Sequence, residues 1–214
     1  SHDLREPVRQ LAIFNELLQK KYKDQLDGPA LELIGHNINA AHRIEDLLKG
    51  LLEYTRAAGA PLVVSGECDA NEVLRKTLEM FEEQIAETSA RIERDPLPEL
   101  PMHEVHLTQI FQNLIGNALK YRSENPPVIH ISAQPAPTEW RLSVSDNGIG
   151  ILPEYREKIF GLFQRLHGGD KYQGHGLGLS ICQKIVQRYG GRIWVEAGPG
   201  GGSNFIFTIP RAQP

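Results

Sequence analysis

The sequence has few cysteines, no excess of basic residues and no long apolar run. Its two cysteines, Cys68 and Cys182, show neither metal-site spacing nor a disulfide framework, which favours a reducing compartment. Lys and Arg total 23 against 27 Asp and Glu, a formal net charge of −4, so nucleic acid is not an expected partner. No apolar stretch approaches the roughly 20 residues that span a bilayer. We therefore expect a cytoplasmic location and no membrane contact for this part of the protein.

The 214 residues have an ordinary globular composition, with 40% hydrophobic and 23% charged side chains. This length suits one large domain or two small ones. A long helical pattern stops at AAGAP, residues 57–61, because Gly and Pro disfavour continuation of a helix. We predict a domain boundary there, with a helical domain over residues 1–60 and a second domain over residues 61–214.

The first region contains two amphipathic helical patterns. Mostly apolar residues recur at alternating steps of four and three, which predicts a stripe along each helix. The stripe positions are Leu4, Val8, Leu11, Asn15, Leu18 and Tyr22 in the first helix, and Ile34, Ile38, Ala41, Glu45, Leu48 and Leu52 in the second. The sequence KDQLDGP, with Gly28 and Pro29, is predicted to form the turn of a helical hairpin.

A hairpin of about 60 residues has too little interior to bury both stripes. Two copies paired into a four-helix bundle would cover them, so we predict a homodimer. The alternative is that the stripes pack against the rest of the same chain.

The second region mixes helices with strands. Asp69 is placed to cap a helix over residues 71–87, and a closing hairpin is predicted around the turn GPGGGS. Further helices are predicted over residues 104–121 and 179–189, and strands over residues 128–133, 139–146, 193–197 and 204–210. This order indicates an α+β fold, an α/β sandwich with helices on one face of a mixed sheet.

The helix predicted over residues 104–121 carries three polar side chains on one side. At about 100° per residue, Asn113, Asn117 and Lys120 fall within about 60° of one another, away from the apolar face. An Asn oxygen is a hard neutral ligand suited to Mg²⁺, and Lys supplies a point charge for phosphate. A solvated polar face is the alternative interpretation.

The motif SVSDNGIGI ends a predicted strand at a carboxylate. Asp146 is able to accept a hydrogen bond from an exocyclic amine, and Gly148 and Gly150 would let a flat ligand approach the backbone. A plain Asp-Asn-Gly turn is the alternative.

A second glycine motif, GHGLGLSICQKIV, leads into a helix. With Gly174, Gly176 and Gly178 at a helix start, backbone N–H groups and the positive helix end are able to hold phosphate. The preceding segment, FGLFQRLHGGDKYQ, is typical of a mobile lid over a ligand, or else of an ordinary surface loop.

Taken in order, these motifs resemble a known family. An Asn-bearing helix, a strand ending in DxGxG, a lid and GxGLGL at a helix start resemble the catalytic and ATP-binding domain of sensor histidine kinases, a branch of the gyrase, heat-shock chaperone and mismatch-repair ATPase superfamily. SHDLREPVR resembles the family's dimerisation and phosphoacceptor box. HDLREPVR, FGLFQRLH and YGGRIWVE are most similar to the phytochrome-like group.

The resemblance implies a role for each matching residue. His2 would be the phosphoacceptor, with Asp3 orienting its ring or accepting its proton. Asn117 would bind Mg²⁺, and Asp146 would read the adenine amine. The residues implied to bind the nucleotide are Asn113, Asn117, Lys120, Tyr121, Asp146, Gly148, Gly150, Arg165, Gly174, Gly176, Leu177 and Gly178.

Two positions depart from the family pattern. Glu6 stands where many members carry Thr or Asn to position water for dephosphorylating the partner, which puts phosphatase activity in doubt. His175 replaces a small residue in the last glycine box, where its ring would contact phosphate or point outward.

The function implied is a homodimeric, ATP- and Mg²⁺-dependent histidine autokinase. It would pass the phosphoryl group to an aspartate in the receiver domain of a response regulator, under an upstream sensor domain. One alternative is a dimeric signalling scaffold with little turnover. Another is an ATPase without histidine transfer, which is disfavoured because Asn113 occupies the position where hydrolytic members place a Glu base.

Overall fold

The computed structural model describes residues 2–58, 66–166 and 176–211. The chain divides into two compact units, Ser1–Arg56 and Ala57–Pro214.

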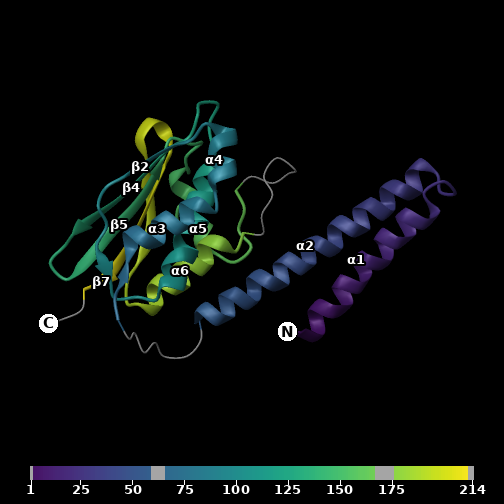
Figure 1. Cartoon of the computed structure of the whole chain (residues 1–214), viewed down its shortest axis with the longest axis horizontal. Coiled ribbons are helices and arrows are strands. Elements are labelled where there is room, and N and C mark those ends of the chain that lie inside the picture. The colour runs from purple at the N-terminus through teal and green to yellow at the C-terminus, as the bar shows by residue number, and fades with distance from the viewer. Residues whose placement is uncertain (1, 59–65, 167–175, 212–214) are drawn as a thin grey trace. The chain divides into compact units, whose positions relative to one another are not determined.

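The first unit is a hairpin of two helices, α1 (His2–Tyr22) and α2 (Gly28–Ala58), which run side by side (Figure 1). Ala12 and Ala41 are buried, with 4% and 5% of their surface exposed. Glu16 and His42 approach each other across the hairpin, with 3.4 Å between Oε1 and Nε2. The predicted helical hairpin is confirmed.

The turn of the hairpin is shorter than the sequence predicts. Gly28 and Pro29 form the first turn of α2 instead of the loop. The reason is a cap, because the N–H of Ala30 donates to the carboxylate of Asp27 at 2.8 Å. Proline is tolerated there since its missing N–H would have no partner within the helix.

Large apolar side chains of α1 remain exposed within the hairpin. Leu11, Phe14 and Leu18 have 56%, 60% and 45% of their surface exposed. Their spacing of three and four residues places them on one side of the helix. The hairpin therefore has an apolar face that its own two helices leave uncovered.

The second unit contains a five-stranded sheet in the order β2-β4-β5-β7-β6. The β2–β4 pair is parallel, and the other neighbours are antiparallel. The strands are β2 (Arg91–Arg94), β4 (Val128–Pro135), β5 (Glu139–Asp146), β6 (Ile193–Ala197) and β7 (Ser203–Pro210). Two short strands, β1 (Cys68–Asp69) and β3 (Glu99–Leu100), pair separately.

Helices cover one face of this sheet (Figure 1). They are α3 (Ala70–Glu79), α4 (Glu82–Thr88), α5 (Glu104–Lys120) and α6 (Gly178–Arg188), and the short turns are η1 (Pro153–Tyr155), η2 (Lys158–Phe160) and η3 (Pro199–Gly201). The core forms between the layers, where the rings of Phe111 in α5 and Phe207 in β7 meet edge to face at 6.5 Å. The predicted α/β sandwich is confirmed.

The helix predicted over residues 71–87 is interrupted. α3 ends at Glu79 and α4 begins at Glu82, with Phe81 turning the chain between them. The ring of Phe81 lies 3.6 Å from the position that a Cβ on Gly116 of α5 would occupy, so tertiary packing overrides local helix preference. The predicted cap is confirmed, because the N–H of Asn71 donates to Asp69 Oδ1 at 2.8 Å.

Candidate functional site

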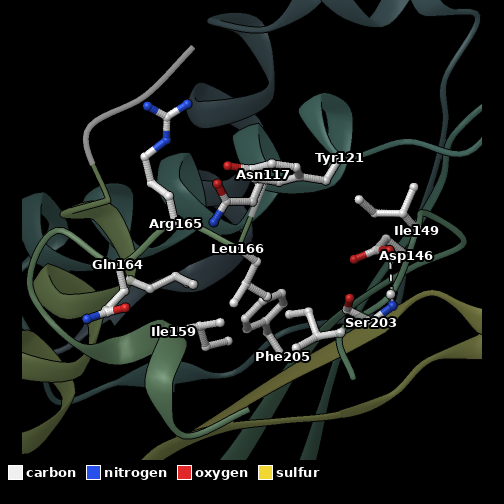
Figure 2. A pocket seen from close by; sticks show the side chains of 13 residues that line it. Asn117, Tyr121, Asp146, Ile149, Ile159, Gln164, Arg165, Leu166, Ser203 and Phe205 are labelled. Carbon is white, nitrogen blue, oxygen red and sulfur yellow. Dashed lines mark hydrogen bonds between the residues drawn. The ribbon is translucent and has the colours of Figure 1, made fainter. Parts of the chain in front are cut away.

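A pocket of about 600 Å³ of empty space, partly open to solvent, lies at the end of β5. Its walls come from α5, the segment after β5, the loop after η2, the start of α6 and β7. The lining residues are Asn117, Tyr121, Asp146, Ile149, Gly150, Ile151, Ile159, Gln164, Arg165, Leu166, Leu179, Ser203 and Phe205. Figure 2 shows Asp146 and Arg165 at opposite ends of the pocket.

Asp146 is the buried carboxylate of the pocket. Alternation along β5 places it on the same face as Leu142 and Val144, toward the helices, and 8% of its surface is exposed. Its Oδ1 accepts hydrogen bonds from the N–H of Gly148 at 2.8 Å and of Ser203 at 3.1 Å. Among the described residues, Oδ2 has no hydrogen-bond partner. The pocket thus presents one unused acceptor.

Burial sets the ionisation of this carboxylate. Desolvation raises the pKa of Asp146 above its ordinary value, and the hydrogen bonds from Gly148 and Ser203 oppose that rise. A ligand N–H group that donated to Oδ2 would give this second oxygen a partner as well.

Four nucleotide-binding residues were predicted on α5 and at its C-terminal end, and two of them lie in the pocket wall. Asn117 and Tyr121 line the pocket, one turn apart (Figure 2). Lys120 is not a lining residue, and its Nζ lies 4.6 Å from the ring centroid of Tyr121. In this structure the ammonium stacks on the ring that forms part of the wall.

Asn113 lies on the side of α5 that faces α6, and it does not line the pocket. Its Nδ2 donates to the carbonyl of Gln109 at 2.8 Å. A Cβ on Gly178 would be 2.3 Å from Asn113 Oδ1, so a side chain where α6 begins would force the Asn113 amide to move. Asn113 also hydrogen-bonds Cys182, whose pKa burial raises to about 12. Asn113 therefore fixes the start of α6 against α5.

The glycines after Asp146 are needed for contacts within the protein. A Cβ on Gly148 would lie 2.3 Å from the carbonyl oxygen of Tyr121, and the N–H of Ile149 donates to that oxygen at 3.0 Å. These contacts join the end of α5 to the DNGIG segment. Gly150 lines the pocket and adopts a left-handed φ of +69°.

The last glycine box is described in part. Leu177 is buried in the core and Gly178 begins α6, while the following residue, Leu179, reaches the pocket. Gly176 has a φ of +68° and packs on the backbone of Gln164. The predicted Gly174 and the departure His175 lie outside the described residues.

The predicted phosphoacceptor His2 is the first residue of α1. The side chains of His2 and Asp3 lie outside the described part of the chain. Glu6, one turn later, accepts a hydrogen bond from Gln10 at 3.4 Å and lies 3.5 Å from Arg9. The Glu6 carboxylate thus interacts with side chains of its own helix.

Several lining residues have no role assigned from the sequence. Ile159 and Phe205 are buried like ordinary core residues, whereas Ile149 and Leu166 lie inside the quoted DNGIG and FGLFQRLH segments. Phe205 pairs with Val144 and so lies on the same face of the sheet as Asp146. Ser203 was assigned only to a closing turn. The pairing of β7 with β5 places Ser203 beside Asp146, and the sequence alone does not show that pairing.

Neither a metal cluster nor a membrane span is found in residues 2–58, 66–166 and 176–211. No three His, Cys, Asp or Glu side chains gather there as a metal site. None of the helices there is both long and apolar enough to cross a membrane.

Helices on one face of a mixed sheet, with an Asp at a strand end facing a pocket, define a class of ATP-binding domains. Residues 102–213 match the histidine kinase-, DNA gyrase B- and HSP90-like ATPase family, and the chain belongs to that family. Within it, the relatives are phytochrome-like and other sensor histidine kinases. Cyanobacterial phytochrome A of Nostoc sp. (strain PCC 7120 / SAG 25.82 / UTEX 2576) is 44% identical over 98% of this chain, which spans 27% of that protein.

Solved structures agree with this assignment. Full-length ShkA in complex with AMPPNP is 26% identical, with a TM-score of 0.71 over 100% of this chain and 45% of that chain. Histidine kinase ThkA in complex with the response regulator protein TrrA is 28% identical, with a TM-score of 0.66 over 99% of this chain and 60% of that chain.

Proposed function

We propose that the chain is the core of a sensor histidine kinase that phosphorylates His2 with ATP and passes the phosphoryl group to an aspartate of a response regulator. Residues 1–60 would dimerise and carry the phosphoryl group, and residues 61–214 would bind ATP. The observation that carries the proposal is Asp146, a buried carboxylate whose Oδ2 is unpartnered among the described residues and which lines a pocket.

The pocket suits an adenine nucleotide. The pocket is partly open to solvent and combines mostly apolar walls with a few polar groups, as small-molecule sites do. Asp146 Oδ2 would accept from the exocyclic amine of adenine, and Ile149, Ile159 and Phe205 provide apolar walls for its faces. Arg165 at the other end supplies positive charge for the phosphates (Figure 2).

The donor set of the pocket suits Mg²⁺ bound together with phosphate. Asn117 contributes a neutral amide oxygen to the lining, and Asp146 is the single carboxylate among the described lining residues. Mg²⁺ is commonly held by one or two protein ligands plus substrate phosphates. Asn117 would hold the ion, which would neutralise phosphate charge during transfer.

The transfer step is in-line phosphoryl transfer. A neutral imidazole nitrogen of His2 would attack the γ-phosphorus, a P–N bond would form, and the bond to the leaving ADP oxygen would break. Asp3 would orient the ring or take its proton. A receiver aspartate would then attack the phosphorus and free His2; the ThkA complex with response regulator TrrA supports a partner of this class.

The hairpin supports a homodimer. Leu11, Phe14 and Leu18 form the uncovered apolar face of α1, which a second hairpin would cover in a four-helix bundle. An upstream sensor domain belongs to the proposal, because the chain spans 27% of the phytochrome it matches. A cytoplasmic location completes it.

The signalling scaffold remains the second candidate, and incubation with γ-labelled ATP and Mg²⁺ separates the two. Wild type should gain acid-labile label, because a P–N bond hydrolyses readily in acid. His2→Gln should remove the acceptor, and Asn117→Ala should cost at least tenfold in rate by removing the metal ligand. The control is His36→Gln, an exposed histidine on α2 with 71% of its side chain accessible.

The outcomes decide between the proposals. Label retained in His2→Gln contradicts the assigned acceptor. Nucleotide binding without label in wild type favours the scaffold. Release of labelled phosphate with no protein label would favour a simple ATPase, which the amide at Asn113 disfavours because it is unable to take a proton from water.

A further inference from the structure

The chain between β6 and β7 contacts the end of β5 and the segment after it through three successive residues: Gly201, Gly202 and Ser203, the first residue of β7. The carbonyl oxygen of Gly201 lies 2.2 Å from the position that a Cβ on Gly150 would occupy. A Cβ on Gly202 would lie 2.0 Å from the carbonyl oxygen of Asp146. The N–H of Ser203 donates to Asp146 Oδ1 at 3.1 Å. Three successive residues therefore press on the backbone and side chain that present the buried carboxylate.

Glycine is required at position 202 by space. Its φ of −74° is available to any residue, but a side chain would strike the backbone of Asp146 and Asn147. Gly200 is the opposite case, because its φ is +64° and nothing lies within 4 Å of where its Cβ would be. Gly202→Ala therefore introduces a clash with the end of β5, whereas Gly200→Ala introduces local backbone strain alone. Comparing the two variants separates these effects.

The orientation of the carboxylate depends on this turn. Oδ1 has two donors, one from Gly148 within its own loop and one from Ser203 on the neighbouring strand. With both N–H groups in place, the plane of the carboxylate is fixed and Oδ2 is left for the pocket. With the Ser203 donor displaced, the group would keep one local bond and gain freedom to rotate.

We propose that Gly201–Ser203 is a positioning element for nucleobase recognition, which holds Asp146 so that Oδ2 meets the amine of the base. The inference rests on the proposed function, in which Asp146 reads that amine. What is new in the inference is that selectivity for adenine also depends on a turn more than 50 residues further along the chain, outside the motif that contains Asp146.

The test compares ADP with inosine diphosphate, which carries an oxygen in place of the exocyclic amine. Calorimetric titration in the presence of Mg²⁺ gives both dissociation constants for the full chain. Wild type should prefer ADP by about tenfold or more, as expected of a site built around a hydrogen bond. Gly202→Ala should bring this ratio toward one, mainly by weakening ADP. Gly200→Ala should lose some stability and keep the ratio.

Thermal unfolding checks that each variant is folded. Where Gly202→Ala fails to fold, insertion of one glycine after Gly200 displaces the turn without adding a Cβ, and it should also lower the ratio. General damage to the pocket would weaken both nucleotides equally and leave the ratio unchanged, which would overturn the inference.

The variant Asp146→Asn distinguishes failure of the proposed role of Asp146 from failure of the positioning role of Gly201–Ser203. Equal binding of ADP and inosine diphosphate by wild type overturns the proposed role of Asp146, and the inference with it. A wild-type preference that is lost in Asp146→Asn and kept in Gly202→Ala overturns the inference alone.

Discussion

The two units bury their apolar residues in different ways. In the sandwich, Phe111, Phe207 and their neighbours are closed off between helices and sheet. In the hairpin, the buried apolar residues among the described side chains are Ala12 and Ala41, while Leu11 and Phe14 are more than half exposed. The sandwich has a core of its own, and the hairpin leaves an apolar face uncovered by its two helices. If the hairpin dimerises as proposed, folding of the sandwich and association of the hairpin are separate properties.

The largest expected effect is on the sandwich core. Phe207→Ala removes a fully buried ring that packs edge to face on Phe111, and such truncations cost about 3–5 kcal/mol. Chemical denaturation should show this loss, while the association of the hairpin stays unchanged. Val105→Ala, on the exposed side of α5, should cost less than about 0.5 kcal/mol. Equal losses in the two variants would contradict a closed core.

An intermediate effect is expected on the hairpin. Phe14→Glu places a charge on the uncovered apolar face, where burial of a Phe in a dimer contributes about 1.5–3 kcal/mol per copy. Sedimentation at a series of dilutions should show dissociation at concentrations at least tenfold higher than for wild type. Lys20→Glu introduces the same side chain away from that face and should leave association unchanged. A monomeric wild type would instead show that this face has no second copy to cover it.

The smallest effect is a pH dependence confined to the sandwich. Burial, followed by the charges of Arg188 and His103, lowers the pKa of His106, and Nδ1 of His106 lies 2.7 Å from the hydroxyl of Tyr189. Below the unfolded value of about 6.5, the unfolded chain binds more protons than the folded one, so stability falls as the pH falls through that range.

Thermal unfolding between pH 7 and pH 5 measures this loss. His106→Gln should reduce it, because the group that titrates is gone. A pH dependence unchanged by His106→Gln would assign the effect to other groups.

Local signals predicted the elements that depend on local structure. The Asp69 cap follows from the position of its carboxylate next to the backbone N–H groups of the first turn of α3. Strand alternation gave β4, β5 and β7, since one side of each strand is covered by helices. By contrast, the break at Phe81 depends on Gly116, which is distant in sequence. The strand β2 (Arg91–Arg94) was missed because it is four residues long and carries three charges.

Part of the pocket lining consists of residues singled out in the sequence, whereas the apolar residues of its walls were not singled out. Asn117, Tyr121, Asp146, Gly150 and Arg165 line the pocket, and their binding of nucleotide stays a prediction. The helix wheel placed Asn113 beside Asn117, but its amide N–H donates to the carbonyl of Gln109 and its oxygen lies against Gly178 at the start of α6.

Ser203 and Phe205 were missed for a different reason. They reach the pocket because β7 pairs with β5, and no spacing within one segment records that pairing.

The length of β5 has a practical consequence for spectroscopy. The strand runs from Glu139 to Asp146, so its two ends are about 23 Å apart at the usual rise per residue. Burial raises the thiol pKa of Cys182 to about 12 and that of Cys68 to about 11, which leaves both poor nucleophiles at neutral pH. A fluorophore attached through a new thiol in the exposed turn at Thr138 would therefore report on the sheet from its far end without touching bound nucleotide.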